Sequence, residues 1–287
     1  MIEALEQIIQ AYLRKVVQKE NIVVFALIAI YTWIFVNPLK NAAVAMKVRV
    51  ASYTYLFMIN DHVVHLTMLS VFLLFLAVVL NDSTSFIQCL EKWGFKVATV
   101  GHIIFAMIIV LLFQAITIAV ANVIMSPVQT LDLEWGEGWN LLSIQKNLNQ
   151  FSPMFYPSAF LIEEYSAQEA TIKTLLFETA LLLSLTLLTS VLINLANKIV
   201  AFLFDIVLIL SDLLFYNLYP IPFRKFSLVS LCMLDTYQKP EVASGITEQY
   251  ARIVFIAVLA LALLTCFACN YLLCKKRIEV SEVKFSK

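Results

Sequence analysis

The stretch LLFETALLLSLTLLTSVLINLANKIVAFLFDIVLILSDLLFYNLY, residues 175–219, decides the class of fold. It contains two apolar runs, 175–196 and 199–219, separated only by Asn197 and Lys198. A helix needs about 20 residues to cross the hydrocarbon core of a bilayer, and each run has about that length. So short a link permits only a tight antiparallel hairpin. The stretch therefore predicts two adjacent membrane-spanning helices.

Four more apolar runs bring the predicted number of spans to six. The chain is 61% hydrophobic and only 14% charged, whereas soluble domains average about 25% charged residues. A further span over 42–59 is not expected, because Lys47 and Arg49 would be costly inside the membrane. We predict an all-α integral membrane protein that forms a single transmembrane domain over 1–287. The other four spans are expected at 22–39, 63–80, 97–125 and 253–274.

Residues 2–19 precede the first span and have the pattern of an amphipathic helix. Apolar residues recur there at spacings of three and four, which places them on one helix face. Such a helix can lie flat in the membrane interface, or it can dock on a protein partner. The apolar face consists of Ile2, Leu5, Ile9, Tyr12 and Val16.

Basic residues at the two ends of the chain favour one orientation. Arg14, Lys15 and Lys19 precede the first span, and the basic run 275–277 follows the last. Lysine and arginine beside a span are enriched on the cytoplasmic side of the membrane. We therefore expect both termini in the cytoplasm, in a cell membrane. Two sizeable loops, 126–171 and 220–250, then lie outside.

Several kinds of chemistry find no support in the sequence. The 20 basic and 20 acidic residues give no net charge, so we expect no nucleic-acid partner. No phosphate-binding loop, no zinc-protease motif and no nucleophile elbow occurs, so we expect neither catalysis nor a cofactor. His62 and His65 could share one helix face with Asp61 nearby. A zinc site normally takes three or four protein ligands, and we expect no metal here.

Two carboxylic acids lie inside the run 199–219. Asp205 and Asp212 are seven residues apart, which places them on one face of a helix. An ionisable residue at membrane depth usually faces protein or a wet cavity. The pair therefore either lines a substrate path or forms structural hydrogen bonds. Glu178 is nearer the end of its run and is expected to reach the interface. Polar residues that could join the path or act as hydrogen-bond partners are Gln114, Asn122 and Asn194.

The order of parts resembles the ABC-2 type permeases, the membrane subunits of ABC exporters. The shared order is an interfacial N-terminal helix, six spans, a loop between the second and third, a tight hairpin, and an outer segment before the last span. Local stretches are also similar to bacterial permeases of that class. They are FMINDHVV at 57–64, VVLNDSTSF at 78–86, EKWGFKVATVGHIIF at 91–105 and LEWGEGW at 133–139.

The resemblance implies half of a dimeric exporter that works with a separate ATPase subunit and a second permease copy or paralogue. The loop 81–96 would contain the coupling helix that docks on the ATPase. Residues 2–19 would form the connecting helix, and 221–234 would form an outer gate. Docking surfaces combine apolar anchors with a polar rim. The anchors would be Phe86, Leu90, Trp93 and Phe95, and the rim Glu91, Lys92 and Lys96.

Two other hypotheses stay open. In the first, the chain is a membrane scaffold or sensor that presents Trp135, Trp139 and the FSPMFYP stretch to a ligand. In the second, it is an intramembrane enzyme acting on lipid, with Asp205 and Asp212 as acid and base. Under the permease hypothesis, the scarcity of charge in the spans favours an amphipathic cargo such as an antimicrobial peptide.

Overall fold

The structure is a computed structural model. It describes residues 19–80, 84–144, 155, 157–217, 221–237 and 246–285, with isolated positions before residue 19. Side chains are not described at 17–21, 84–91, 144, 221–222 and 276–285. The predicted interfacial helix 2–19 therefore lies largely outside the described residues.

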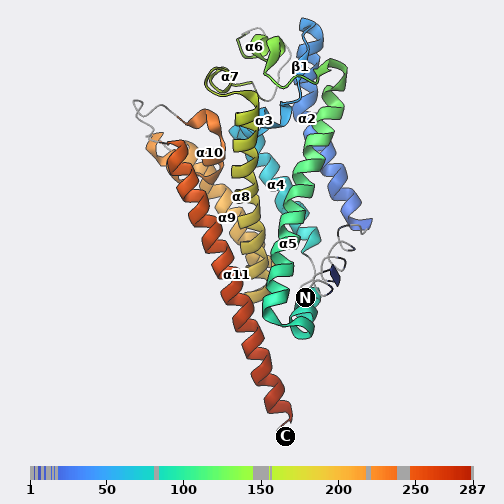
Figure 1. Ribbon diagram of the computed structural model, residues 1–287, viewed down its shortest axis with the longest axis vertical. Coiled ribbons are helices and arrows are strands. Elements are labelled where there is room, and N and C mark those ends of the chain that lie inside the picture. Colours follow the sequence, from blue (N-terminus) through green and yellow to red (C-terminus); the bar gives the residue numbers. More distant parts are fainter. Residues whose placement is uncertain are drawn as a thin grey trace.

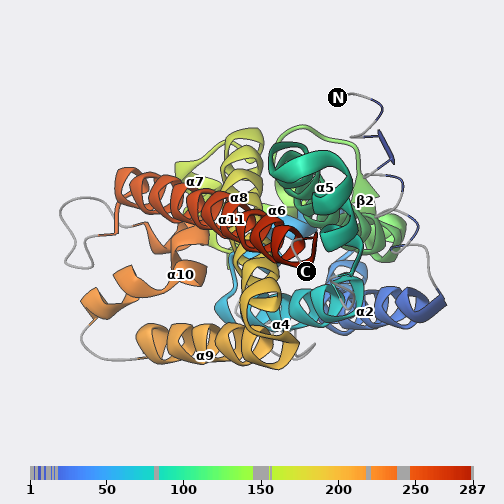
Figure 2. The ribbon, with the colours of Figure 1, turned by 90° about the horizontal axis from the view of Figure 1, so that it is seen from below.

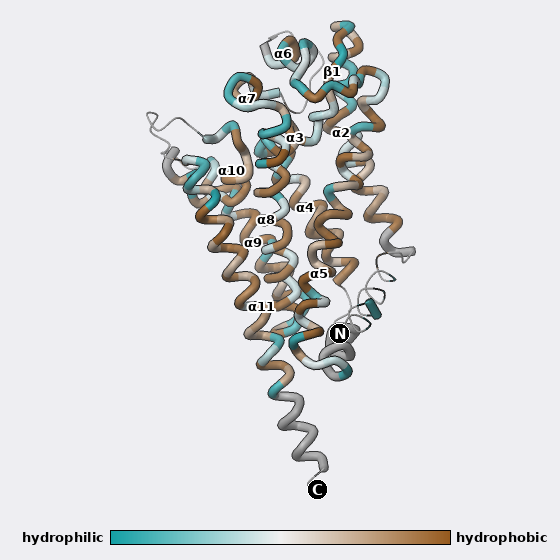
Figure 3. Tube along the Cα trace, in the orientation of Figure 1, coloured by the Kyte–Doolittle hydropathy of each residue, from teal (hydrophilic) through white to brown (hydrophobic). Residues whose placement is uncertain are grey.

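Six helices in the described part of the chain are long and apolar enough to cross a membrane. They suggest a multi-pass membrane protein. Figure 3 shows apolar residues along the middle of the bundle and more polar residues at the end that carries β1, α6 and α7. The six are α2 (Lys19–Met46), α4 (His62–Val79), α5 (Thr84–Met125), α8 (Ala167–Leu195), α9 (Lys198–Asn217) and α11 (Glu248–Phe285).

Helix α8 lies at the centre of the bundle and α9 at its edge (Figure 2). Helix α8 contacts α5, α9 and α11, as well as the short helices α3 (Thr54–Ile59) and α10 (Leu228–Cys232). Its link to α9 consists of Ala196 and Asn197. Among the six long helices α8 is the most buried and α9 the least. A polar side chain on α8 therefore meets protein on most sides.

The short elements gather at one end of the bundle, here called the cap end (Figure 1). Three connections between the long helices lie there, and each is longer than the links at the opposite end. The short elements are β1 (Val50–Ala51), α3, η1 (Ser126–Val128), β2 (Gln129–Thr130), α6 (Gly136–Ile144), α7 (Ala159–Glu164), η3 (Ile221–Phe226), α10 and η4 (Leu234–Thr236).

A two-stranded parallel sheet ties the first two of these connections together. Val50 pairs with Gln129, and Ala51 pairs with Thr130. Helix α6 lies against β1 so closely that a Cβ at Gly138 would stand 1.8 Å from the carbonyl oxygen of Arg49. Only glycine permits this approach of helix to strand.

Helix α5 is broken near the end of the bundle opposite the cap. Gly94 has φ 77° and ψ 166°, which are not helical values. A positive φ is a conformation that glycine adopts without steric cost. A short helical segment from Thr84 therefore meets the long span at an angle, and the span itself begins after Gly94 (Figure 1).

Several helices extend beyond the ranges expected from the sequence, and α2 and α8 are two of them. Helix α2 continues past Pro38 to Met46, although a proline usually ends or kinks a helix. Helix α8 begins at Ala167, eight residues before the expected start at 175, and Ser166 caps it by accepting a hydrogen bond from the amide of Glu169 at 3.3 Å. In the sequence, polar residues mark the ends of the apolar runs. In the structure, contacts with other elements allow the helices to continue past these polar residues.

Candidate functional site

The proposed substrate-path residues do not converge in the structure. Asp205 is fully buried and accepts a hydrogen bond from the hydroxyl of Thr189 on α8, at 2.6 Å. Gln114 is buried and accepts from the hydroxyl of Thr179, at 3.1 Å. Asn122 accepts from the side-chain amide of Gln129 at 3.1 Å, beside β2.

Asp212 binds the segment that follows α9. Its carboxylate accepts hydrogen bonds from the Ser227 hydroxyl at 3.0 Å and from the Val229 backbone amide at 3.1 Å. The latter amide lies in the first turn of α10, where backbone N–H groups lack partners within the helix. His62 Nε2 lies 3.4 Å from the same carboxylate. Asp212 therefore joins α9, α10 and the start of α4.

The partners of the two aspartates differ from the expected ones. Asp205 binds Thr189, and Asp212 binds the segment 227–229, whereas Asn194, Asn122 and Gln114 were the candidates. Ser227 lies outside the long apolar runs and was therefore not among the expected partners. Its position before the apolar residues 228–234 is the pattern of a helix N-cap, which is the signal that could have indicated it.

An aromatic and basic group borders Asp212 on the cap side. The ring of His62 stacks on that of Tyr216, with centroids 3.5 Å apart and planes 7° from parallel. The Arg224 guanidinium lies 4.4 Å from the centre of the Tyr216 ring. Its Nε also donates to the Tyr216 carbonyl at 3.2 Å. These contacts hold η3 against the end of α9.

Glu178 is fully buried, and the expectation that it reaches the interface is wrong. The early start of α8 places it about three turns inside the helix. The Tyr55 hydroxyl on α3 donates to Glu178 Oε2 at 2.6 Å. Gln114 on α5 lies beside the same carboxyl. The sequence signal that could have identified this site is a glutamate within an apolar run long enough to span the membrane.

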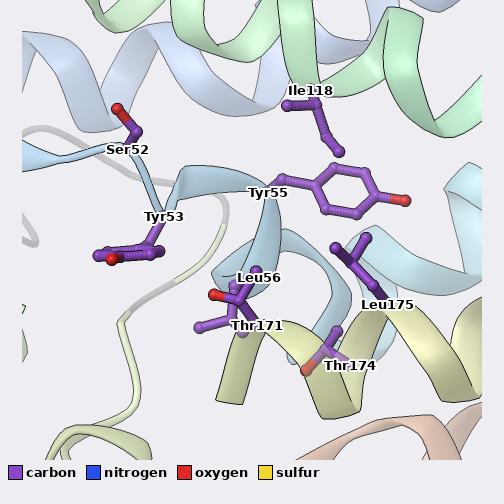
Figure 4. A pocket seen from close by; sticks show the side chains of 8 residues that line it. All are labelled: Ser52, Tyr53, Tyr55, Leu56, Ile118, Thr171, Thr174 and Leu175. Carbon is purple, nitrogen blue, oxygen red and sulfur yellow. The ribbon is translucent and has the colours of Figure 1, made fainter. Parts of the chain in front are cut away.

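A cavity of about 60 Å³ lies next to this group. Figure 4 shows Tyr55 and Thr174 in its wall, with the Tyr55 hydroxyl pointing away from Ser52 and Tyr53. Neither Asp205 nor Asp212 lines this cavity. The remaining lining residues are Leu56, Ile118, Thr171 and Leu175.

A larger groove of about 870 Å³ lies at the cap end. It runs between α6, α7 and the start of α8, and buried Trp135 forms part of its wall. The Trp135 indole donates to the Tyr165 carbonyl at 2.8 Å. Glu134 and Glu137 give the groove an acidic side.

The proposed coupling residues lie at the opposite end of the bundle. Lys92 and Lys96 are exposed, and Trp93 is half-buried, with the Lys92 ammonium 4.6 Å from its ring centre. Lys92 also donates to the side chain of Gln7 at 3.3 Å. Phe95 packs edge-on against Tyr271 of α11, with ring centroids 5.5 Å apart. The side chains of Phe86, Leu90 and Glu91 lie outside the described residues.

The described residues contain no group of three histidine, cysteine, aspartate or glutamate side chains that could hold a metal ion. His62 and His65 are both buried in the bundle.

No family model, no curated protein and no solved structure matches this chain. Its function must therefore be inferred from the residues themselves.

The carboxyl of Asp235 in η4 predicts how the stability of the cap end depends on pH. Burial, together with the charge of nearby Asp61, raises the pKa of its carboxyl from 3.8 to about 7, although Arg224 acts in the opposite direction. The folded state then binds a proton more tightly than the unfolded chain. The contribution of Asp235 to stability is therefore fully present below about pH 4 and is lost as the pH rises through about 7.

We expect Asp235→Asn to reduce this loss of stability with rising pH. The measurement is the thermal unfolding midpoint in detergent at a series of pH values. Some slope should remain, because burial also raises the pKa of Asp61. Asp132→Asn is the matched control, since Asp132 is an exposed residue of the cap. An unchanged slope in Asp235→Asn would contradict the assignment.

Proposed function

We propose that this chain is the membrane-spanning permease subunit of an ATP-driven exporter of the ABC-2 type. It would form the substrate path together with a second permease copy or paralogue, and a separate subunit would hydrolyse ATP. The observation that carries the proposal is the break at Gly94, which sets a short helical segment at the end of the bundle away from the cap. A segment so placed can receive force from a partner outside the membrane.

The residues on both sides of the break support this role. Lys92, Trp93 and Lys96 offer one aromatic and two basic side chains at that end. Phe95 contacts Tyr271 on α11 instead of projecting outward. A push on the short segment would therefore reach α11 through this aromatic pair. Shifts of packed helices between two arrangements are an established form of conformational change.

The proposed orientation places the cap outside the cell and both termini in the cytoplasm. The basic residues that flank the first and last spans favour it. The segment 221–234, which is largely buried from Ser227 on, would close the substrate path on the outer side. The sparse charge of the spans favours an amphipathic cargo, such as an antimicrobial peptide.

The test is purification of the chain from its native membrane in mild detergent, with identification of the proteins that accompany it. We expect a stoichiometric partner that carries a phosphate-binding loop. Trp93→Ala should weaken this association by about 30-fold, the effect of losing an interface hot spot worth about 2 kcal/mol. Trp33→Ala is the control, because Trp33 is exposed on α2. A pure chain without an ATPase would refute the proposal.

A second candidate function is a scaffold or sensor that binds a ligand at the cap. The groove of about 870 Å³ beside Trp135 favours it. In that case no ATPase accompanies the chain, and substitutions of groove residues such as Asn140 and Gln168 abolish binding while Trp93→Ala has no effect.

A further inference from the structure

Glu178 is a carboxylic acid at membrane depth with no exposure to solvent. Placing an ionised carboxylate in such surroundings costs several kcal/mol unless a counter-charge accompanies it. Within the described part of the chain, no basic side chain forms an ion pair with Glu178. Some other positive charge must therefore balance the carboxylate.

The groups that face Glu178 come from four elements, and none of them is a cation. Tyr55 of α3 donates to Oε2, and Gln114 of α5 lies beside the carboxyl. Tyr31 of α2 and Cys232 of α10 are near enough to interact with its charge. Oε1 makes no hydrogen bond of ordinary length to a described residue, although the Gln114 side-chain amide, whose Nε2 also has no such bond, interacts with the carboxyl. Four neighbouring elements thus provide polar contacts without supplying a positive charge.

The available space identifies the missing cation. The Tyr55 and Glu178 oxygens are in direct contact at 2.6 Å, which leaves no room for a metal ion between them. Calcium takes six to eight oxygen ligands, and other hard cations also need several. Two carboxyl oxygens, one phenol and one amide are too few for such a shell. A proton needs no shell and fits on the unpaired Oε1.

The cavity of about 60 Å³ offers a source of protons, since it is large enough to hold water. Tyr55 belongs both to its wall and to the hydrogen bond with Glu178 (Figure 4). Thr174, one helical turn before Glu178, also lines it. Motion of the Tyr55 ring would therefore admit water to the carboxyl.

We propose that Glu178 is a proton-binding site, and that Tyr55 gates its exchange with water in the cavity. When the gate opens, a hydronium ion transfers one proton to the Glu178 carboxylate and leaves as water. The reverse step returns the proton to water. This site does not depend on the permease function.

The experiment is infrared spectroscopy of the full chain in liposomes, at neutral pH and in sodium-free buffer. We expect a protonated-carboxyl band that is absent in Glu178→Gln, and that shifts after transfer to D₂O. Tyr55→Phe should move this band to higher frequency, because one hydrogen bond is lost. Thr174→Leu fills the cavity and should slow deuteration by about tenfold, since exchange then requires wider opening.

Labelling the wild-type chain with ¹³C-glutamate assigns the band even if Glu178→Gln fails to fold. Asp132→Asn is the matched control and should leave the band unchanged, because Asp132 is an exposed residue of the cap end. Three results would overturn the proposal. They are absence of the band from mildly acidic to mildly basic pH, a band that never exchanges in D₂O, and a band that sodium ions abolish.

Discussion

Trp139→Ala is expected to destabilise the cap end by about 3–5 kcal/mol, the range for removing a buried tryptophan. Trp139 is fully buried and packs against Phe57, with ring centroids 4.5 Å apart. Its indole N–H donates to the Ala51 carbonyl of β1 at 2.9 Å. The substitution removes both the packing and the donor, so α6 loses its main attachment to β1.

Chemical denaturation in detergent measures this loss, and amide hydrogen exchange locates it. We expect faster exchange at Val50 and Ala51, while the amides of α8 remain protected. Trp33→Ala is the matched control, because the Trp33 side chain is 54% exposed on α2. Equal destabilisation by the two substitutions would show that Trp139 does not hold the cap together.

Asp212→Ala is expected to release α10 from the bundle at a cost of about 3 kcal/mol. The aspartate accepts one hydrogen bond from Ser227 and one from the Val229 amide. Its removal leaves the buried Val229 amide unpaired and leaves Ser230 Oγ as the only acceptor of the Ser227 hydroxyl. An unpaired buried group costs about 1–3 kcal/mol. Asp212→Asn keeps one acceptor oxygen and should lose about half as much.

Cys232 reports this release, because it is completely buried in α10. A cost of about 3 kcal/mol corresponds to a thiol-labelling rate about 100-fold above that of the wild type, if labelling follows local opening. Peptide mass spectrometry separates Cys232 from the other cysteines. Asp132→Ala, at an exposed position, should leave the rate unchanged. If Asp212→Ala also has no effect, other contacts anchor α10.

The candidate site was only partly accessible from the sequence. Asp205 and Asp212 are identifiable because a carboxylate stands out in an apolar run, and the structure places both in the protein interior. Their partners were not identifiable, because Ser227 lies 15 residues from Asp212 in a connection with little apolar periodicity. Tyr55 is 123 residues from Glu178, and no local pattern indicates such a contact.

The sequence by itself determined the six apolar helices and the tight turn between α8 and α9. The physical reason is local, since the length and hydrophobicity of a run decide whether a helix can cross a bilayer. Only the tertiary structure decided that α8 is central, that Glu178 is buried and that α10 folds back against Asp212. These features depend on contacts between residues far apart in the chain, which hydropathy does not encode.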